Sequence, residues 1–539
     1  MRATQRTAML AQHMTSGRAR AAPQPPLADH MDAQVQLLSD ESVRVILLNR
    51  PQALNALNYE MIDAFGDALK SATASPNAAM VVLRGVGRAL CAGGDVMEIV
   101  TNADSADPAV RDRPVHFFQK ELLQNWNIGN LEHASSEHGA PKWYISIMDG
   151  IVMGGGVGLS VHAPFRVASE RTLFAMPEVG IGFFPDVGVT HALARLDGHV
   201  GAYLALTGAR VGGADVYLTG LASHYVRSEL IDALVHRLAE LPLRAAEDGE
   251  AVSNVMDEFS SDPFADDVEN GPALRADSPF LGERRIALDV AFGQPSAERI
   301  VGALQDVADG HADSPTAKEI EKRGGTLSEP VRAWAASSLA AIKTKSPRSV
   351  KVALRAVEIA RSRTLAEVLY RDMRIATAFC DLSLGRDFYV GVQHTLTKDP
   401  ATGKRRAGNP PWNPARLEDV SEAEITTLFF SDPEKAYKAG LRIRVPPLLD
   451  VPLPDSRDAR HAREQQVRGL GPLHWEPRYN RFALPSDAEC AALAEGSHPA
   501  AGSYVLSGPE LLSVIARHKH HKPALRLKVT DWLQRTHYQ

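Results

Sequence analysis

Twice before residue 160, this chain runs from a short apolar segment through a glycine-rich turn into a stretch with helical periodicity. The first turn is Cys91-Ala-Gly-Gly-Asp95, and the second is Met153-Gly-Gly-Gly-Val-Gly158. The segments that precede the turns, 80–84 and 142–148, are apolar over most of their length, as buried strands are. Strands that alternate with helices in this way predict an α/β fold.

The residues before the first turn fit the same plan. Residues 34–49 predict two short strands about a polar turn. Asn58 is placed to cap a following helix, since its side chain can accept a hydrogen bond from the first turn. Apolar residues then recur at helical spacing: Met61, Ile62, Phe65, Ala68 and Leu69. We therefore expect residues 29–245 to form one α/β domain.

The chain has 539 residues, too many for one ordinary compact core, so further segments are expected. Residues 246–440 are assigned to a helical region. Its acidic start, up to about residue 280, predicts a loop-rich connection, whereas 330–380 has the pattern of long amphipathic helices. Residues 441–539 are rich in Pro, Arg and His and predict an irregular extension with one late helix, Pro509–Arg517.

Composition argues against several classes of protein. No apolar run approaches the roughly 20 residues needed to cross a bilayer, so no transmembrane helix is expected. The cysteines, Cys91, Cys380 and Cys490, form no CxxC pair, which argues against a disulfide scaffold and a structural zinc site. The net charge is −6, and the acidic body of the chain disfavours a general nucleic-acid-binding surface.

The first 28 residues have a composition of their own. They contain no acid and four arginines, Arg2, Arg6, Arg18 and Arg20. An arginine-bearing, acid-free start without an apolar centre is typical of a mitochondrial transit peptide. A disordered tail is the alternative interpretation.

The glycine-rich turns permit a specific chemistry. Glycine lets a backbone approach a ligand closely, and a helix start presents N–H groups that have no acceptor within the helix. Two such groups from separate turns would form an oxyanion hole. Neither turn fits a phosphate-binding motif, because GxGxxG fails at the second turn and no Gly-Lys-Ser/Thr follows either. Two ordinary strand–helix turns are the alternative.

Two acids stand out in the segment 176–188, which is otherwise apolar or shaped by Gly and Pro. A buried carboxylate without a partner is unfavourable, so Glu178 and Asp186 should be solvated, hydrogen-bonded or catalytic. The alternative for Asp186 is that it caps a helix beginning near Val187.

Four motifs in order resemble the crotonase superfamily, and within it the 3-hydroxyisobutyryl-CoA hydrolases. They are the segments 48–57 (LNRPQALNAL), 90–95 (LCAGGD), 150–160 (GIVMGGGVGLS) and 174–186 (FAMPEVGIGFFPD). With the helical region, the resemblance covers some 400 residues. It implies a spiral of ββα units and hydrolysis of a short acyl-CoA thioester in valine breakdown, in the mitochondrial matrix. CoA would enter as part of the substrate, and no other cofactor is implied.

The resemblance also assigns roles to residues. The backbone N–H groups of Gly94 and Gly155 would bind the thioester oxygen. Glu178 and Asp186 match the catalytic acids, which attack or activate water at the thioester carbon. Glu121 matches a substrate-contacting carboxylate, with a solvent-facing helix acid as the alternative. The Asn55 segment would line the CoA cleft, mostly through its backbone.

The resemblance also brings in two alternative functions. Enoyl-CoA hydratases use two glutamates; one matches Glu178, but the other position is Gly158 here. A relative of the hydrolase also serves as a small-subunit protein of some mitochondrial ribosomes. Arginines in the extension permit contact with RNA or protein: Arg457, Arg460, Arg463, Arg468, Arg478 and Arg481.

The basic run His518-Lys-His-His-Lys522 is expected to be a solvated helix end. A metal site there would need carboxylate or cysteine partners from elsewhere, so no metal ligands are assigned. The sequence does not specify an oligomeric state.

Overall fold

The computed structural model describes residues 32–136, 139–265, 275, 277–399, 403–404, 406–448 and 480–538. The proposed targeting segment 1–28 and the arginines from Arg457 to Arg478 lie outside the described residues. No helix in these ranges combines the length and the apolar character that a bilayer crossing requires.

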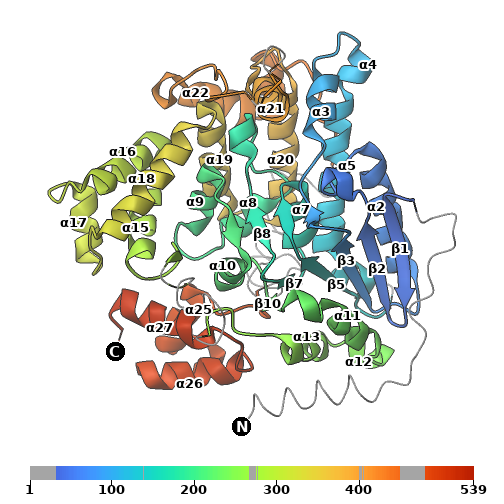
Figure 1. The fold of residues 1–539 in the computed structure, drawn as a ribbon, viewed down its shortest axis with the longest axis vertical. Helices are drawn as coiled ribbons and strands as arrows, with labels where there is room; N and C mark the ends of the chain where they lie inside the picture. Colours follow the sequence, from blue (N-terminus) through green and yellow to red (C-terminus); the bar gives the residue numbers. More distant parts are fainter. Residues whose placement is uncertain are drawn as a thin grey trace.

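The strands of the described residues form two sheets (Figure 1). Their order is β1-β2-β3-β5-β7-β10 in the larger sheet and β4-β6-β8-β9 in the smaller. The bounds are β1 Val35–Asp40, β2 Val43–Leu48, β3 Met80–Gly85, β4 Ala89–Cys91, β5 Trp143–Met148, β6 Ile151–Met153, β7 Phe165–Ala168, β8 Leu173–Ala175, β9 Val211–Gly212 and β10 His224–Tyr225.

Successive strand pairs are shared between the two sheets. The pairs β3 and β4, β5 and β6, and β7 and β8 each give one strand to each sheet, and neighbouring units pair in parallel. This arrangement confirms the predicted spiral of ββα units. The accompanying helices are α2 Tyr59–Ala74, α3 Val96–Ala103, α4 Pro108–Arg111, α5 Arg113–Gly129, α6 Leu131–Ser136, α7 Gly155–Val161, α8 Val189–Leu193, α9 Val200–Thr207, α10 Gly213–Leu218, α11 Ile231–Ala239, α12 Leu243–Ala246 and α13 Gly249–Phe259.

The first predicted elements form as expected. The two strands of 34–49 are β1 and β2, which pair antiparallel about the turn at 41–42. Asn58 caps α2 by accepting the Met61 N–H at 2.8 Å. The apolar positions predicted for this helix are all buried.

Both faces of the larger sheet are covered. Along β3, Val81 and Leu83 contribute to the main core, whereas Met80 and Val82 face a second apolar cluster. Residues of a strand point alternately to opposite faces, so the near-continuous apolar runs of β3 and β5 follow from burial on both sides. The second cluster lies between the sheet and helices α11 and α13.

The prediction of a loop-rich connection at 245–280 is wrong for its first part. Residues Gly249–Phe259 form α13, which buries Val252, Val255 and Met256 beneath the sheet. Glu250 and Glu258 occupy exposed positions of this helix, so its acidic composition conceals the apolar spacing of the buried face.

The helical region packs against the α/β domain and contributes to the same main core, and the helices predicted within 330–380 are present as α18, α19 and α20 (Figure 1). Its helices are α15 Gly282–Phe292, α16 Ala297–Asp309, α17 Pro315–Lys322, α18 Glu329–Lys343, α19 Pro347–Ala360, α20 Leu365–Cys380, α21 Asp387–Leu396, α22 Glu422–Ile425 and α23 Pro433–Lys438.

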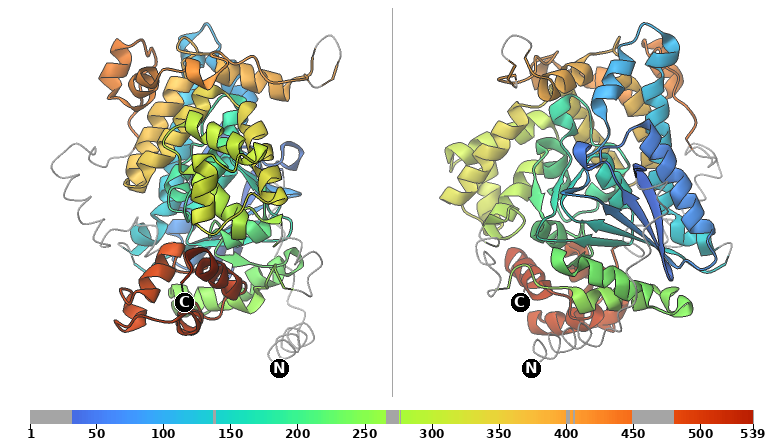
Figure 2. Two further views of the ribbon diagram at one scale, coloured as in Figure 1. Left: turned by 90° about the vertical axis from the view of Figure 1, so that its left-hand side faces the viewer. Right: turned by 45° about the vertical axis from the view of Figure 1, so that its right-hand side comes forward.

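The expectation of an irregular C-terminal extension is wrong for residues 480–538. They form three helices, α25 Asp487–Ala494, α26 Gly508–His518 and α27 Leu525–Thr536. Only α26 was predicted. Ser486 caps α25, and Ser507 forms a capping box with Glu510 in α26. We call residues 480–538 the C-terminal cap. Both views of Figure 2 place it at the end of the molecule opposite α21 and α22.

Apolar contacts join the C-terminal cap to the sheet. Phe482 is 2 % exposed and stacks on Phe165 of β7, with ring centroids 4.5 Å apart. It also meets the edge of Trp143 in β5, at 6.5 Å. The cap therefore completes the second apolar cluster.

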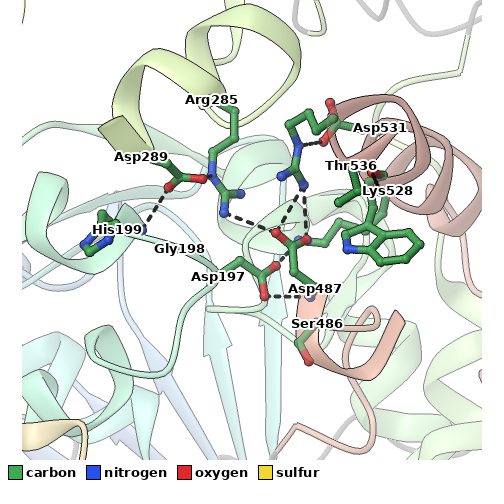
Figure 3. Close-up of polar contacts among 12 residues, drawn as sticks. Asp197, Gly198, His199, Arg285, Asp289, Ser486, Asp487, Lys528, Asp531 and Thr536 are labelled. Carbon is green, nitrogen blue, oxygen red and sulfur yellow. Dashed lines mark hydrogen bonds and ion pairs between the residues drawn. The ribbon is translucent and has the colours of Figure 1, made fainter. Parts of the chain in front are cut away.

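Buried ion pairs hold the other side of the cap (Figure 3). Lys528 of α27 lies 2.5 Å from Asp197, and Arg535 lies 3.1 Å from Asp487. Arg285 of α15, only 2 % exposed, contacts Asp487 at 3.3 Å across the junction. Since each charge is withdrawn from water, it needs its partner, and the cap is an integral part of the fold.

Candidate active site

The glycine-rich turns and the predicted carboxylates line one cavity of about 440 Å³. Helices α3, α5 and α21 complete its wall. The polar and glycine residues facing the cavity are Gly93, Gly94, Asp95, Glu121, Gly154, Gly155, Glu178, Asp186 and Thr395. Of the predicted site residues, only Asn55 is absent from the lining.

The two turns approach each other closely. A Cβ atom built on Gly154 would lie 3.4 Å from the Gly93 Cα, and one built on Gly93 would lie 3.8 Å from the Gly155 nitrogen. Gly154 has a φ of 48°, where residues with side chains are strained. On Gly155 a Cβ would overlap the Glu121 carboxylate. The glycines thus permit the tight turn and leave space for a ligand.

The predicted oxyanion donors occupy suitable positions. Gly155 is the first residue of α7, so its N–H has no acceptor within the helix. Leu57 forms a β-bridge beside Gly94: its N–H donates to the Gly93 carbonyl and its carbonyl accepts the Asp95 N–H, both at 2.8 Å. The N–H of Gly94 is outside this bridge. The role of the two donors remains a prediction that the geometry permits.

Three carboxylates are buried around these turns. Glu121, in α5, is 2 % exposed, so the alternative of a solvent-facing acid is wrong. Glu178 begins the short helix η3 (Glu178–Ile181), and Asp186 follows in the next loop; both are buried. Glu121 Oε1 and Glu178 Oε2 have no hydrogen-bond partner among the described residues. Such oxygens are ready to bind water or a substrate.

Burial raises the pKa of all three groups, and the charge of Asp186 raises those of Glu121 and Glu178 further. Burial raises the pKa of Asp186 to about 7. Burial, with the charge of Asp186 beside it, raises the pKa of Glu121 and of Glu178 well above the usual value. Three negative charges in one desolvated cavity are unfavourable, so the cluster retains protons near neutral pH. One site can thus hold both a base and an acid.

The residue after Asp186 is strained. Val187 is β-branched yet has a φ of 55°. Its carbonyl contacts His162 Nε2 at 2.7 Å, and the Gly188 N–H donates to the buried Asp372 carboxylate at 2.8 Å. Helix α8 begins at Val189 without a side-chain cap, so the alternative of Asp186 as a helix cap is wrong. We infer that His162 and Asp372 hold the turn that presents Asp186.

Asn55 lies behind the cavity wall. Its side-chain nitrogen donates to the carbonyl oxygens of Val86 and Ala89, at 3.0 and 2.8 Å, and the residue is fully buried. Its neighbours Ala53 and Ala56 line the cavity instead. Asn55 therefore shapes the turn, and a backbone contact of this segment with CoA remains a prediction.

The position that hydratases fill with a second glutamate has no room here. A Cβ on Gly158 would lie 2.6 Å from the Val187 Cβ and 2.8 Å from Asn125 Nδ2. Any side chain would displace the strained turn beside Asp186.

Sequence reasoning missed the part of the site that comes from the helical region. Phe388 and Leu396 of α21 line the cavity together with Phe183. The Phe183 and Phe388 rings stack at 4.4 Å. No sequence motif predicts this contact, because the loop that α21 packs against lies some 200 residues earlier in the chain.

Comparison with known proteins agrees with this architecture. The sequence profile described as enoyl-CoA hydratase/isomerase matches residues 43–429. The chain belongs to this family. A solved family structure, a carnitinyl-CoA dehydratase from Mycobacterium thermoresistibile, is similar with a TM-score of 0.57 and 30 % identity, over 76 % of this chain and 100 % of that one.

Two family relatives differ in how much of this chain they match. The mitochondrial 3-hydroxyisobutyryl-CoA hydrolase of Xenopus tropicalis is 36 % identical over 402 residues, 74 % of this chain and 89 % of its own length. The small ribosomal subunit protein mS47 of Neurospora crassa is 32 % identical over 502 residues, 92 % of this chain and 84 % of its own. This second match leaves out fewer residues of the chain than the C-terminal cap contains. The matched range therefore includes part of the cap.

Proposed function

We propose that the chain hydrolyses the thioester of 3-hydroxyisobutyryl-CoA, or of a similar short acyl-CoA, to the free acid and CoA. The observation that carries this proposal is the cavity in which buried carboxylates with unpartnered oxygens face two glycine turns. The similarity to the Xenopus tropicalis hydrolase supports the choice of substrate.

In the proposed reaction, water attacks the thioester carbon while an ionised carboxylate takes its proton. The carbonyl oxygen becomes negative and accepts hydrogen bonds from the Gly94 and Gly155 N–H groups; such donors are worth roughly 3 kcal/mol each. The carbon–sulfur bond then breaks, and the leaving thiolate takes a proton from a protonated carboxyl. Glu178 and Asp186 supply these two states, because their raised pKa values keep protons in the cluster.

The reaction needs only water besides the acyl-CoA, so we propose no resident cofactor. Hydratase chemistry is disfavoured, since Gly158 supplies no second glutamate and is closely packed. The mitochondrial relatives and the arginines of the first 28 residues support a place in the mitochondrial matrix, within valine breakdown.

The test is hydrolysis of 3-hydroxyisobutyryl-CoA by protein lacking residues 1–28, followed through release of free thiol. Asp186→Asn should lower kcat at least about 100-fold with unchanged folding, as expected for the loss of a proton-transferring group. Glu60→Gln, an exposed acid on α2, is the matched control and should keep full activity. No hydrolysis and no CoA binding by the unaltered protein would refute the proposal.

A second candidate function is that of a structural protein of the mitochondrial small ribosomal subunit. The observation that favours it is that the match with mS47 includes part of the C-terminal cap, whereas the family profile ends at residue 429. The arginines of the extension would then contact RNA or protein.

Co-sedimentation tests this second function. The tagged chain should travel with the small subunit in a sucrose gradient of mitochondrial lysate, and a full-length variant with the arginines of the extension changed to glutamine should not. Quantitative recovery of the full chain among unassembled proteins would contradict it. The two functions are compatible, because no residue of the C-terminal cap lines the cavity.

A further inference from the structure

The C-terminal cap brings together two histidines and a glutamate that are distant in sequence. Glu489 lies in α25, His498 precedes the turn 499–501, and His518 ends α26. One ligand atom from each lies within 4.8 Å of the other two. All three side chains line a cavity of about 500 Å³ between the cap and α13. The fold thus supplies the carboxylate that the sequence around His518 lacks.

The spacing suits a transition-metal ion. Glu489 Oε1 lies 3.3 Å from His518 Nε2. The ligands of a tetrahedral zinc ion, each about 2.1 Å from the metal, lie roughly 3.4 Å apart. The His498 and His518 rings are 5.1 Å apart between centroids and inclined at 68°, so both can turn a nitrogen toward one point.

The other charges of this cavity are already paired. Lys519 holds Glu489 Oε2 at 3.0 Å, which leaves Oε1 on the side of the histidines. Lys522 pairs with Asp257 at 2.8 Å. The cavity therefore does not present a free cationic surface to an anion. Its distinctive groups are two imidazoles and one carboxylate oxygen, and oxygen-seeking Mg²⁺ or Ca²⁺ would not select such a set.

We propose that Glu489, His498 and His518 bind a divalent transition-metal ion of the zinc type, with the fourth position open to water in the cavity. Two histidines and one glutamate form a known set of zinc ligands. The ion would tie α25, the turn at 498 and α26 together and so stabilise the cap. This site is separate from the proposed active site and does not depend on it.

Metal binding requires one rearrangement. The Ala500 N–H donates to His498 Nδ1 at 3.1 Å. Ligation through either ring nitrogen breaks this bond, because the Nδ1 lone pair is then used by the metal or replaced by a proton. One neutral hydrogen bond is a small loss beside three metal–ligand bonds.

The experiment is a calorimetric titration of the metal-free full chain with ZnCl₂ at pH 7.5, where an ordinary histidine is mostly neutral. We expect one equivalent of zinc to bind in the micromolar range or tighter. Glu489→Gln and His518→Ala should each weaken binding at least tenfold. His520→Ala is the matched control, since this exposed ring lies in the same basic run but faces Glu250 at 3.8 Å.

Thermal unfolding gives a second readout. Zinc should raise the Tm of the unaltered chain and of His520→Ala, and it should not raise that of His518→Ala. Two results would overturn the proposal: no saturable binding below about 100 µM, or equal binding by the unaltered chain and by His518→Ala. His518 ends its helix and is partly exposed, so this variant is expected to fold even if Glu489→Gln does not.

Discussion

At the scale of single residues, the cavity holds groups whose positions oppose stability. Three carboxylates share a desolvated space, and a β-branched residue adopts a left-handed conformation beside one of them. Strain and buried charge of this kind persist when the surrounding structure enforces them, and they concentrate at functional sites. Removing them should therefore affect stability and activity in opposite directions.

The first prediction concerns Asp186. Its folded-state pKa of about 7 exceeds the unfolded value near 4, so the folded state binds the proton more tightly. The resulting stability is present below about pH 4 and is lost as the pH rises through 7. Asp186→Asn cannot ionise, so its Tm relative to the unaltered protein should rise between pH 5 and pH 8. A constant Tm difference in thermal unfolding at the two pH values would contradict this prediction.

The second prediction concerns Asp372, whose carboxylate accepts the Gly188 N–H. Burial, with the charge of Asp186 nearby, raises the pKa of Asp372 well above the usual value. Asp372→Asn keeps an acceptor oxygen and should keep near-normal kcat. Asp372→Ala should lower kcat roughly tenfold or more with little change in KM, because Asp186 would shift.

Steady-state kinetics on the two Asp372 variants distinguishes positioning from folding. Asp372→Ala should also lose about 1–3 kcal/mol of unfolding free energy, the usual effect of leaving a buried donor unpaired. Equal kcat values for the alanine and asparagine variants would show that the Gly188 hydrogen bond does not position Asp186.

At the scale of elements, helices and strands with local sequence signals could be predicted, whereas contacts between distant elements could not. The strands of 34–49, the capped helix α2 and the amphipathic α18 to α20 carry their periodicity in the sequence. The sequence analysis does not predict α13, α25 and α27, because the acidic or Pro-, Arg- and His-rich composition of their segments outweighs the helical spacing. Four motifs located Gly94, Gly155, Glu178 and Asp186. The burial of Glu121 and the contribution of α21 depend on how distant helices pack, which no local pattern records.

The third prediction tests α21. Leu396 lines the cavity but is 54 % exposed, so Leu396→Ala should change the free energy of unfolding by less than about 0.5 kcal/mol. Loss of its apolar contact should raise KM for the acyl-CoA several-fold, equivalent to roughly 1 kcal/mol. Leu243→Ala on α12, a comparably exposed leucine outside the cavity, is the control. An unchanged KM in Leu396→Ala would show that this residue of α21 does not contribute to substrate binding.

At the scale of the whole molecule, the C-terminal cap and the α/β core form one cooperative unit. Phe482 inserts into the apolar cluster beneath the sheet, and the ion pairs of Figure 3 join α27 to the core. Asp197 and Lys528 are each less than 10 % exposed. Deleting the cap would leave Asp197 without Lys528 and Arg285 with Asp289 as its remaining partner, so the buried charge of Asp197 would lose its compensation.

The fourth prediction follows from this junction. Lys528→Ala should cost about 3–5 kcal/mol, because Asp197 remains buried without its partner. The matched control is Lys438→Ala, whose pair with Glu434 is 2.9 Å long but 75 % exposed on both sides. That change should cost less than about 1 kcal/mol. Urea denaturation of both variants measures the difference, and similar values would show that the junction contributes little.

The tight packing at Gly158 sets an order for evolutionary change. A glutamate there must displace the Val187 side chain and the Asn125 amide before it can reach any substrate. A single mutation to glutamate at 158 therefore cannot place a second carboxylate in the cavity while Val187 and Asn125 keep their positions. A glutamate at 158 would first require a smaller residue at 187 and a displaced side chain at 125. Each of these changes would loosen the turn that holds Asp186. The close packing at Gly158 therefore separates this chain from two-glutamate chemistry by several changes and not by one.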